Sequence, residues 1–150
     1  MSVSLDPPAP LGPDQISLIE TSFTRALRGK AELADRVYNR FFALEPGVRR
    51  LFPADLSQQR AKITRALSFT VRAMSSDQEL ARIADGLARS HQKFHLRPGQ
   101  LEHMAEAILG ALQDTLGEDF DPATHRSWQA AFNRFLPMIK AAQDKLDAMG

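Results

Sequence analysis

Four histidines are the metal-ligand candidates in this chain of 150 residues, which contains no cysteine. His91 lies one helical turn beyond Leu87 on an apolar face, and His95 follows at the next turn. Residues four apart share one face of a helix, so this pair could in principle bind one metal ion. A hydrogen-bonded core histidine is the commoner explanation for His91 on spacing alone. His103 and His125 lie in polar stretches and are expected at the surface.

Motifs for other kinds of chemistry are absent from the sequence. It contains no P-loop, no G-x-G-x-x-G, no G-x-S-x-G and no H-E-x-x-H pattern. The acidic pair at 118–119 falls in an evident turn and is expected to be solvated. A formal net charge of +1 gives no excess of basic residues of the kind that binds nucleic acid. The remaining charged clusters are expected to be exposed helix faces: Arg49, Arg50, Arg60, Lys62 and Arg65.

Hydrophobic periodicity predicts an all-α protein of about six to eight helices. Apolar residues recur every three or four positions in segments near 13–27, 33–44, 57–74, 77–95, 101–116 and from 121 onward. No segment alternates with period two for long enough to predict a strand. Ser75-Ser76-Asp77 offers an N-cap for the fourth helix, and Gly117 is in place to end the fifth. Pro137 should kink the last helix or remove one of its hydrogen bonds.

The first twelve residues contain three of the nine prolines and predict a disordered N-terminal tail, 1–12, ahead of one domain, 13–150. The N-terminus has no cationic start and no apolar core of a secretory signal. No apolar run approaches the roughly 20 residues that span a bilayer. Without cysteine there is no disulfide, thiolate zinc site or iron–sulfur cluster. We therefore expect a cytoplasmic protein that does not act at a membrane.

Several segments in register resemble the globin family. Residues 11–16 resemble the opening of many globins' first helix, and residues 38–52 resemble the second helix and following corner of bacterial single-domain globins and flavohaemoglobins. Residues 87–91 resemble the segment that carries the proximal iron ligand, and Trp128 falls where those globins keep a tryptophan. The resemblance covers roughly residues 11–142. It implies a globin fold over 13–150 that encloses haem b.

By this resemblance His91 is the proximal iron ligand. Its other ring nitrogen should donate to a backbone carbonyl one turn back, near Leu87, which would fix the tautomer. On the other side of the haem, the resemblance places Tyr38 and Gln59 over the sixth coordination position. A core tyrosine with a satisfied hydroxyl is the alternative for Tyr38, and Gln58 is the competing candidate for the glutamine.

The resemblance also implies a set of residues that pack around the haem. Phe52 would lie flat on the macrocycle, Ile63 would face the iron, and Lys62 would reach a propionate. Four further residues would surround the porphyrin, although all are also ordinary core candidates: Leu87, Leu96, Met104 and Ile108.

The implied function is reversible binding of O2, and of NO or CO, at a five-coordinate iron, with oxygen transport as the role. One alternative is a nitric oxide dioxygenase that needs a separate reductase, and another is a sensor of a gas or other ligand. Flavohaemoglobins support the proximal histidine with a tyrosine and a glutamate, but those positions here are Leu101 and Gln143. This departure argues against peroxidase-like chemistry and against efficient dioxygenase chemistry. A monomer and a homodimer both fit the sequence, and His95 has no assigned role.

Overall fold

The computed structural model describes residues 11–28, 32–92 and 99–149. Within these ranges the chain forms six α-helices and three short 3-10 helices, with no strand, which confirms the all-α prediction. The α-helices are α1 (Pro13–Leu27), α2 (Glu32–Leu44), α3 (Ser57–Arg72), α4 (Asp77–His91), α5 (Gln100–Leu116) and α6 (Pro122–Ala148). The 3-10 helices are η1 (Pro46–Leu51), η2 (Ala73–Ser75) and η4 (Gly117–Asp119).

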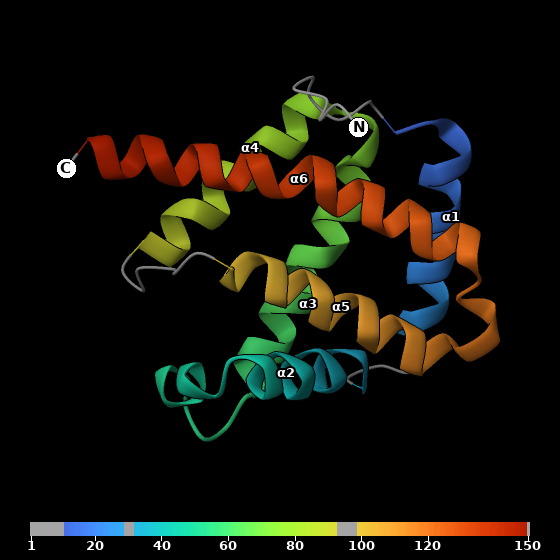
Figure 1. Cartoon of the computed structure of the whole chain (residues 1–150), viewed down its shortest axis with the longest axis horizontal. Coiled ribbons are helices and arrows are strands. Elements are labelled where there is room, and N and C mark those ends of the chain that lie inside the picture. The colour runs from blue at the N-terminus through green and yellow to red at the C-terminus, as the bar shows by residue number, and fades with distance from the viewer. Residues whose placement is uncertain (1–10, 29–31, 93–98, 150) are drawn as a thin grey trace, which may run out of the picture.

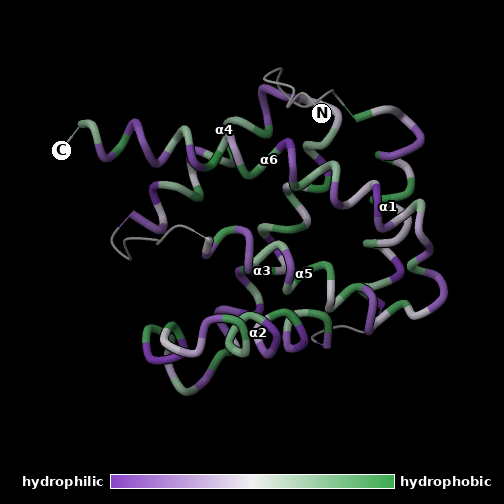
Figure 2. Tube along the Cα trace, viewed as in Figure 1, coloured by the Kyte–Doolittle hydropathy of each residue, from purple (hydrophilic) through white to green (hydrophobic). Residues whose placement is uncertain are grey.

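The helices cross one another at steep angles around a shared core. In the view of Figure 1, α5 and α6 run across the front, α3 and α4 lie behind them, and α2 forms the base. The most extensive packing joins α2 to α5 and α4 to α6, followed by α1 to α6. Hydrophobic and hydrophilic residues alternate along each helix, as expected where one face is buried (Figure 2). None of the helices in the described ranges is both long and apolar enough to cross a bilayer.

Local signals explain where these helices begin and end. The Ser76 hydroxyl accepts a hydrogen bond from the Glu79 amide at 3.2 Å, which confirms the predicted cap of α4. The Asp121 carboxylate accepts from the Thr124 amide at 2.8 Å and caps α6 in the same way. Gly117 follows α5 with a φ of +55°, a conformation that glycine adopts without a Cβ clash.

Three expectations about helix ends and continuity have different outcomes. The helix expected to reach residue 74 changes from α to 3-10 geometry after Arg72. The α4 helix ends at His91, and the expected end near His95 lies outside the described residues. The α6 helix continues without a break through Pro137. Because Pro137 is exposed, the hydrogen bond that it removes lies on the solvent side of the helix.

Trp128 on α6 anchors the core where α1 and α6 meet. Its indole ring is 2% exposed and packs against Phe23 and Phe132, with both centroid distances at 6.2 Å. The indole Nε1–H donates to the Ser22 hydroxyl oxygen at 2.9 Å, so the one polar group of the ring is satisfied. Ser22 in turn donates to the backbone of the preceding turn, at 2.7 Å from the Leu18 carbonyl oxygen.

Arg40 of α2 lies over a glycine where α2 crosses α5. A Cβ atom added at Gly110 would lie 2.5 Å from the Arg40 guanidinium, which lies across the α5 backbone at this point. Arg40 is held there by Asp114, whose carboxylate oxygen accepts from Nε at 2.9 Å and from Nη2 at 2.7 Å. This crossing orients α2, the helix that carries Tyr38.

Candidate functional site

His91 is the last residue of α4, and its imidazole is held by the preceding turn. Nδ1 lies 2.7 Å from the Leu87 carbonyl oxygen, as predicted. A carbonyl oxygen only accepts hydrogen bonds, so Nδ1 is the donor in this contact. A histidine oriented in this way by a backbone carbonyl binds a metal ion through Nε2 when its ring is neutral.

The residues that the structure describes contain no group of three or more histidines and acids that could hold a metal ion. The predicted pairing of His91 with His95 involves a residue outside the described ranges. A single imidazole ligand suits a metal whose remaining ligands come from a macrocycle, as in haem. The donor set therefore fits haem better than a free metal ion.

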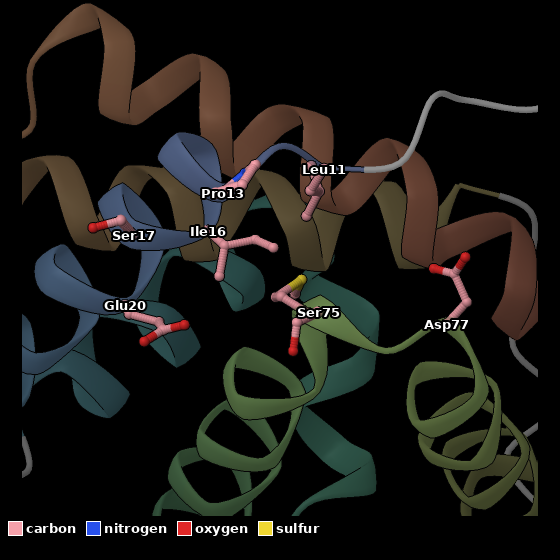
Figure 3. A pocket seen from close by; sticks show the side chains of 8 residues that line it. Leu11, Pro13, Ile16, Ser17, Glu20, Ser75 and Asp77 are labelled. Carbon is pink, nitrogen blue, oxygen red and sulfur yellow. The ribbon is translucent and has the colours of Figure 1, made fainter.

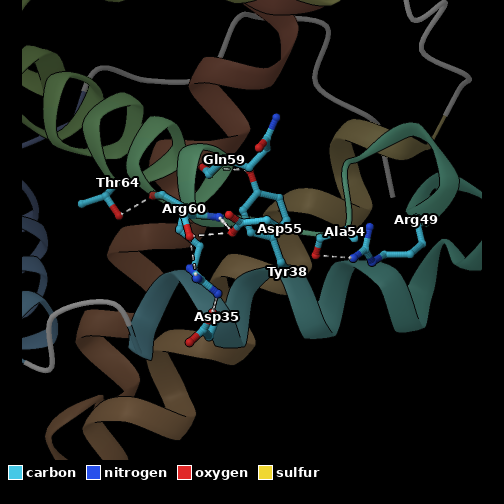
Figure 4. A network of polar contacts seen from close by, with 9 residues as sticks. Asp35, Tyr38, Arg49, Ala54, Asp55, Gln59, Arg60 and Thr64 are labelled. Carbon is cyan, nitrogen blue, oxygen red and sulfur yellow. Dashed lines mark hydrogen bonds and ion pairs between the residues drawn. The ribbon is translucent and has the colours of Figure 1, made fainter.

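Tyr38 on α2 lies in an aromatic cluster at the corner that follows this helix. Its side chain is buried, and its ring centroid is 5.7 Å from both Phe42 and Phe52. The hydroxyl donates to the backbone carbonyl oxygen of Gln59 at 3.2 Å, across from α2 to α3 (Figure 4). Burial raises the pKa of Tyr38 to about 12, so the phenol stays neutral and able to donate at physiological pH.

Gln59 occupies the first turn of α3 and has unmet hydrogen-bonding capacity. Its Oε1 atom is buried and has no partner among the described residues, whereas the neighbouring Gln58 is exposed. The structure therefore favours Gln59 over the competing position. An unsatisfied buried polar atom costs about 1–3 kcal/mol. A polar group bound beside Tyr38 would remove this cost. The buried Gln59 oxygen therefore fits a ligand-binding pocket.

The predicted haem-packing residues differ in how deeply they are buried. Phe52, Ile63, Leu87 and Met104 are half-buried residues at the edge of the core, on different elements. Their remaining apolar surface could pack against a flat apolar group. Ile108 is buried in the core, Lys62 is exposed, and Leu96 lies outside the described residues.

The corner between α2 and α3 is held by an arginine that the sequence analysis expected on an exposed helix face. Half-buried Arg49 donates through Nη1 to the Pro53 carbonyl oxygen at 3.0 Å and through Nη2 to that of Ala54 at 3.3 Å. Its guanidinium carbon lies 5.3 Å from the Phe42 ring centroid, within cation–π range. Arg49 therefore positions the aromatic corner (Figure 4).

A second arginine links the two helices of the pocket. Arg60 is half buried, not exposed, and pairs with Asp35 at 2.7 Å, which joins α3 to α2 (Figure 4). Just before α3, the Ser57 hydroxyl and amide both donate to Asp55, and these hydrogen bonds lower the pKa of that carboxyl group. Sequence reasoning missed these contacts because each partner lies on a different element or in a loop.

Two histidines expected at the surface are partly enclosed. The Nδ1 atom of His103 on α5 is buried and lies 3.4 Å from the Glu45 carboxylate at the end of α2. His125 is half buried and packs against Phe120, with 5.4 Å between ring centroids. Neither is part of the predicted site.

A cavity of about 430 Å³ lies away from these residues, between the start of α1 and the connection from α3 to α4 (Figure 3). Leu11, Pro13 and Ile16 line one side of it, and Ser75 and Asp77 line the other. No predicted haem-site residue lines this cavity.

Comparison with known proteins identifies the family of this fold. The globin family model matches residues 35–139. An uncharacterised globin-like protein from Aquifex aeolicus is 22% identical over 138 residues, which cover 91% of this chain and 96% of the relative.

Solved structures with a similar fold come from distant organisms. A bacterial globin from Campylobacter jejuni has a TM-score of 0.80 at 17% identity, covering 91% of this chain and 99% of that one. A hexacoordinated heme protein from an anhydrobiotic tardigrade has a TM-score of 0.81 at 14% identity, covering 90% and 96%. The hemoglobin of the botfly Gasterophilus intestinalis has a TM-score of 0.78 at 13% identity, covering 89% and 99%.

Proposed function

The chain belongs to the globin family of haem-binding proteins, and we propose that it binds haem b through His91 and reversibly binds O2 on the opposite face. NO and CO are the other gases that such a site would bind. Bound ferrous haem supplies an iron atom with one coordination position open to a diatomic gas. The protein supplies the proximal imidazole, the apolar walls and the polar groups that contact the gas.

The proximal side of the proposed site depends on His91. With Nδ1 donating to Leu87, Nε2 is the ring nitrogen that would bind iron. Phe52, Ile63 and Met104 would supply apolar contacts to the macrocycle.

The observation that carries the proposed gas-binding role is the buried, unpartnered amide oxygen of Gln59 beside the Tyr38 hydroxyl. Rotation about its last bond lets the Gln59 amide present an N–H group to a bound gas. Rotation of the Tyr38 O–H bond does the same for the phenol. Bound O2 carries partial negative charge, so each such hydrogen bond is strengthened.

The hydrogen bond that Tyr38 already makes to Gln59 reduces the free energy that it would gain by donating to bound O2 instead. A hydrogen bond to a charged group contributes about 1.5–3 kcal/mol, whereas one to a neutral carbonyl contributes about 0.5–1.5 kcal/mol. Exchanging the second for the first therefore leaves a gain on the order of 1–2 kcal/mol. At 1.4 kcal/mol per decade, this changes O2 affinity about five- to thirtyfold. Tyr38 thus favours tight O2 binding even though its hydroxyl already has a partner.

Five-coordinate ferrous iron is the expected resting state. An amide is a poor ligand for iron, so Gln59 would leave the sixth position open to gas. This would distinguish the protein from its structural relative in the tardigrade, which is described as hexacoordinated.

A test replaces Tyr38 by phenylalanine and measures O2 release by stopped flow. We expect release to be about tenfold faster, because the donor to the bound gas is lost. Gln59→Leu should also accelerate release, whereas Gln58→Leu, the same change at the exposed neighbour, should not. Unchanged release in Tyr38→Phe would contradict the proposed distal role.

A further inference from the structure

The outer face of α3 carries a run of cations around one exposed aromatic ring. Lys62, Arg65, Phe69 and Arg72, here called the cationic stripe, are all exposed. Steps of three, four and three residues place them on one side of the helix. The span of ten residues is about 15 Å long at 1.5 Å per residue.

No carboxylate balances the cationic stripe. Residues 56–76 contain no Asp or Glu. Lys62, Arg65 and Arg72 make no ion pair with any residue in the described ranges, whereas Arg40, Arg60 and Arg134 each pair with an aspartate. The Arg72 guanidinium carbon lies 5.9 Å from the Phe69 ring centroid, and Phe69 is 50% exposed. This is a positive surface with an aromatic centre.

Charge complementarity requires a negatively charged partner for this surface. A second copy related by two-fold symmetry would bring two cationic stripes together, and like charges would oppose the contact. An anionic membrane gains about 1 kcal/mol per cation near its surface, so the three cations supply about 3 kcal/mol. That figure is below the roughly 4.1 kcal/mol that corresponds to millimolar affinity. A protein with an acidic patch is the better match.

The position of the stripe points to the kind of partner. Gln59 and Ile63 lie on a neighbouring face of the same helix, on the side of the proposed haem pocket. An α-helix with its side chains is about 10–12 Å across. A protein bound to the stripe is therefore separated from the pocket by no more than about one helix diameter. Weak electron-transfer complexes have small interfaces, which suits a stripe of this size.

We propose that the cationic stripe of α3 docks an acidic one-electron carrier protein that reduces the ferric form of this globin. This inference rests on the proposed haem function. In the encounter the carrier loses one electron, and ferric haem iron gains it to become ferrous. Arg65, Phe69 and Arg72 act through binding and orientation of the carrier, without touching the haem.

The test uses an acidic flavodoxin as the probe. Reduction of the ferric protein by reduced flavodoxin should slow about tenfold or more when salt rises from low to physiological concentration. The variant Arg65→Glu/Arg72→Glu should lose about tenfold in rate at low salt. The control Arg126→Glu/Lys145→Glu makes the same charge change at exposed positions on α6 and should lose much less.

Binding is measured separately from reduction. Oxidised flavodoxin added to the 15N-labelled protein should shift amide resonances of α3 around Phe69, and Phe69→Ala should weaken the shifts. Absorption spectra show independently whether each variant holds haem, so a failure of the haem proposal is distinguishable from a failure of docking. Equal reduction rates in the stripe and control variants, or resonance shifts confined to other helices, would overturn the proposal. Stripe-dependent binding to phosphatidylserine vesicles, without flavodoxin binding, would overturn it in favour of a membrane.

Discussion

The hydroxyl of Tyr38 has one hydrogen to donate, and it goes to the Gln59 backbone carbonyl oxygen at 3.2 Å. This contact is to the Gln59 backbone, and the side-chain amide oxygen of the same residue is buried with no partner among the described residues. The Tyr38 hydroxyl therefore has a hydrogen-bond partner, whereas the Gln59 side-chain oxygen has none among the described residues. A bound gas that accepts a hydrogen bond could engage both, at the cost of the existing tyrosine bond. This exchange explains why the predicted effect of Tyr38 on O2 release is moderate.

Tyr38 should titrate well above an ordinary phenol. Burial disfavours the phenolate and raises the pKa from 10.0 to about 12. Tyr38 is the only tyrosine in the chain, so the 13Cζ resonance of a tyrosine-labelled sample reports it without assignment. A midpoint near 10 would show that the ring is exposed to solvent.

The same pKa shift predicts a loss of stability at high pH. The unfolded chain ionises first, near pH 10, so the stabilising difference is fully present below pH 10 and is lost as pH rises toward 12. The free energy of unfolding should fall over this window. Tyr38→Phe should flatten that part of the profile, and denaturant titrations at pH 9, 10.5 and 12 would measure it. An equal fall in both proteins would assign the loss to other groups.

His91→Ala should abolish stable haem binding, because His91 is the proposed iron ligand. His125→Ala provides the matched control, since His125 is half buried on another helix and packs against Phe120. Haem retention through a desalting column, measured at the Soret band, separates the two variants. Full retention with an unaltered ferrous spectrum in His91→Ala would refute the assignment.

At the scale of elements, the crossing of α2 and α5 involves the helix that carries Tyr38. Gly110 lets the Arg40 guanidinium lie against the α5 backbone, and Asp114 holds it there. A Cβ at this position would displace a flexible side chain, not backbone. The expected consequence is loss of an exposed ion pair, worth about 0.2–1 kcal/mol, and not collapse of the crossing.

Gly110→Ala tests the contact with Arg40 at this crossing, and Gly86→Ala on α4 is the control without such a contact. Gly86 lies in α4 with nothing within 4 Å of an added Cβ, so Gly86→Ala should stabilise the protein by about 0.5–1 kcal/mol. Gly110→Ala should gain less, because the clash with Arg40 offsets the gain in helix propensity. Chemical denaturation measures both, and Arg40→Ala should restore the missing part. Equal stabilisation by the two alanines would show that Arg40 moves aside without cost.

The helices could be predicted because their signals are local. The Ser76 cap, the Gly117 terminus and the hydrogen bond from His91 to Leu87 involve residues within four positions of one another. The contacts that build the corner were not predictable in this way. Arg49 binds carbonyl oxygens only four and five residues away, but these lie in an irregular loop whose course no periodicity specifies, and Arg60 reaches Asp35 on another helix. The same residue types on the outer face of α3 make no ion pair with the described residues, so composition alone does not separate the two outcomes.

At the scale of the whole molecule, haem should stabilise the native state against unfolding. A ligand that binds only the native state stabilises it by RT ln(1 + [L]/Kd), about 2.7 kcal/mol at a hundredfold excess over Kd. We therefore expect haem to raise the midpoint of thermal unfolding of the native sequence, and to raise it much less in His91→Ala. Calorimetry with and without stoichiometric haem checks this. An equal shift in both proteins would mean that haem binds elsewhere.

The most direct test is the absorption spectrum of the purified, haem-loaded protein in its ferric form, after reduction, and after exposure to O2. The proposed site predicts a strong Soret band, a five-coordinate ferrous spectrum and a stable O2 complex. Loss of this band in His91→Ala would assign the iron ligand. A six-coordinate ferrous spectrum would contradict the open distal position, and the absence of any haem band after reconstitution would contradict the proposed function itself.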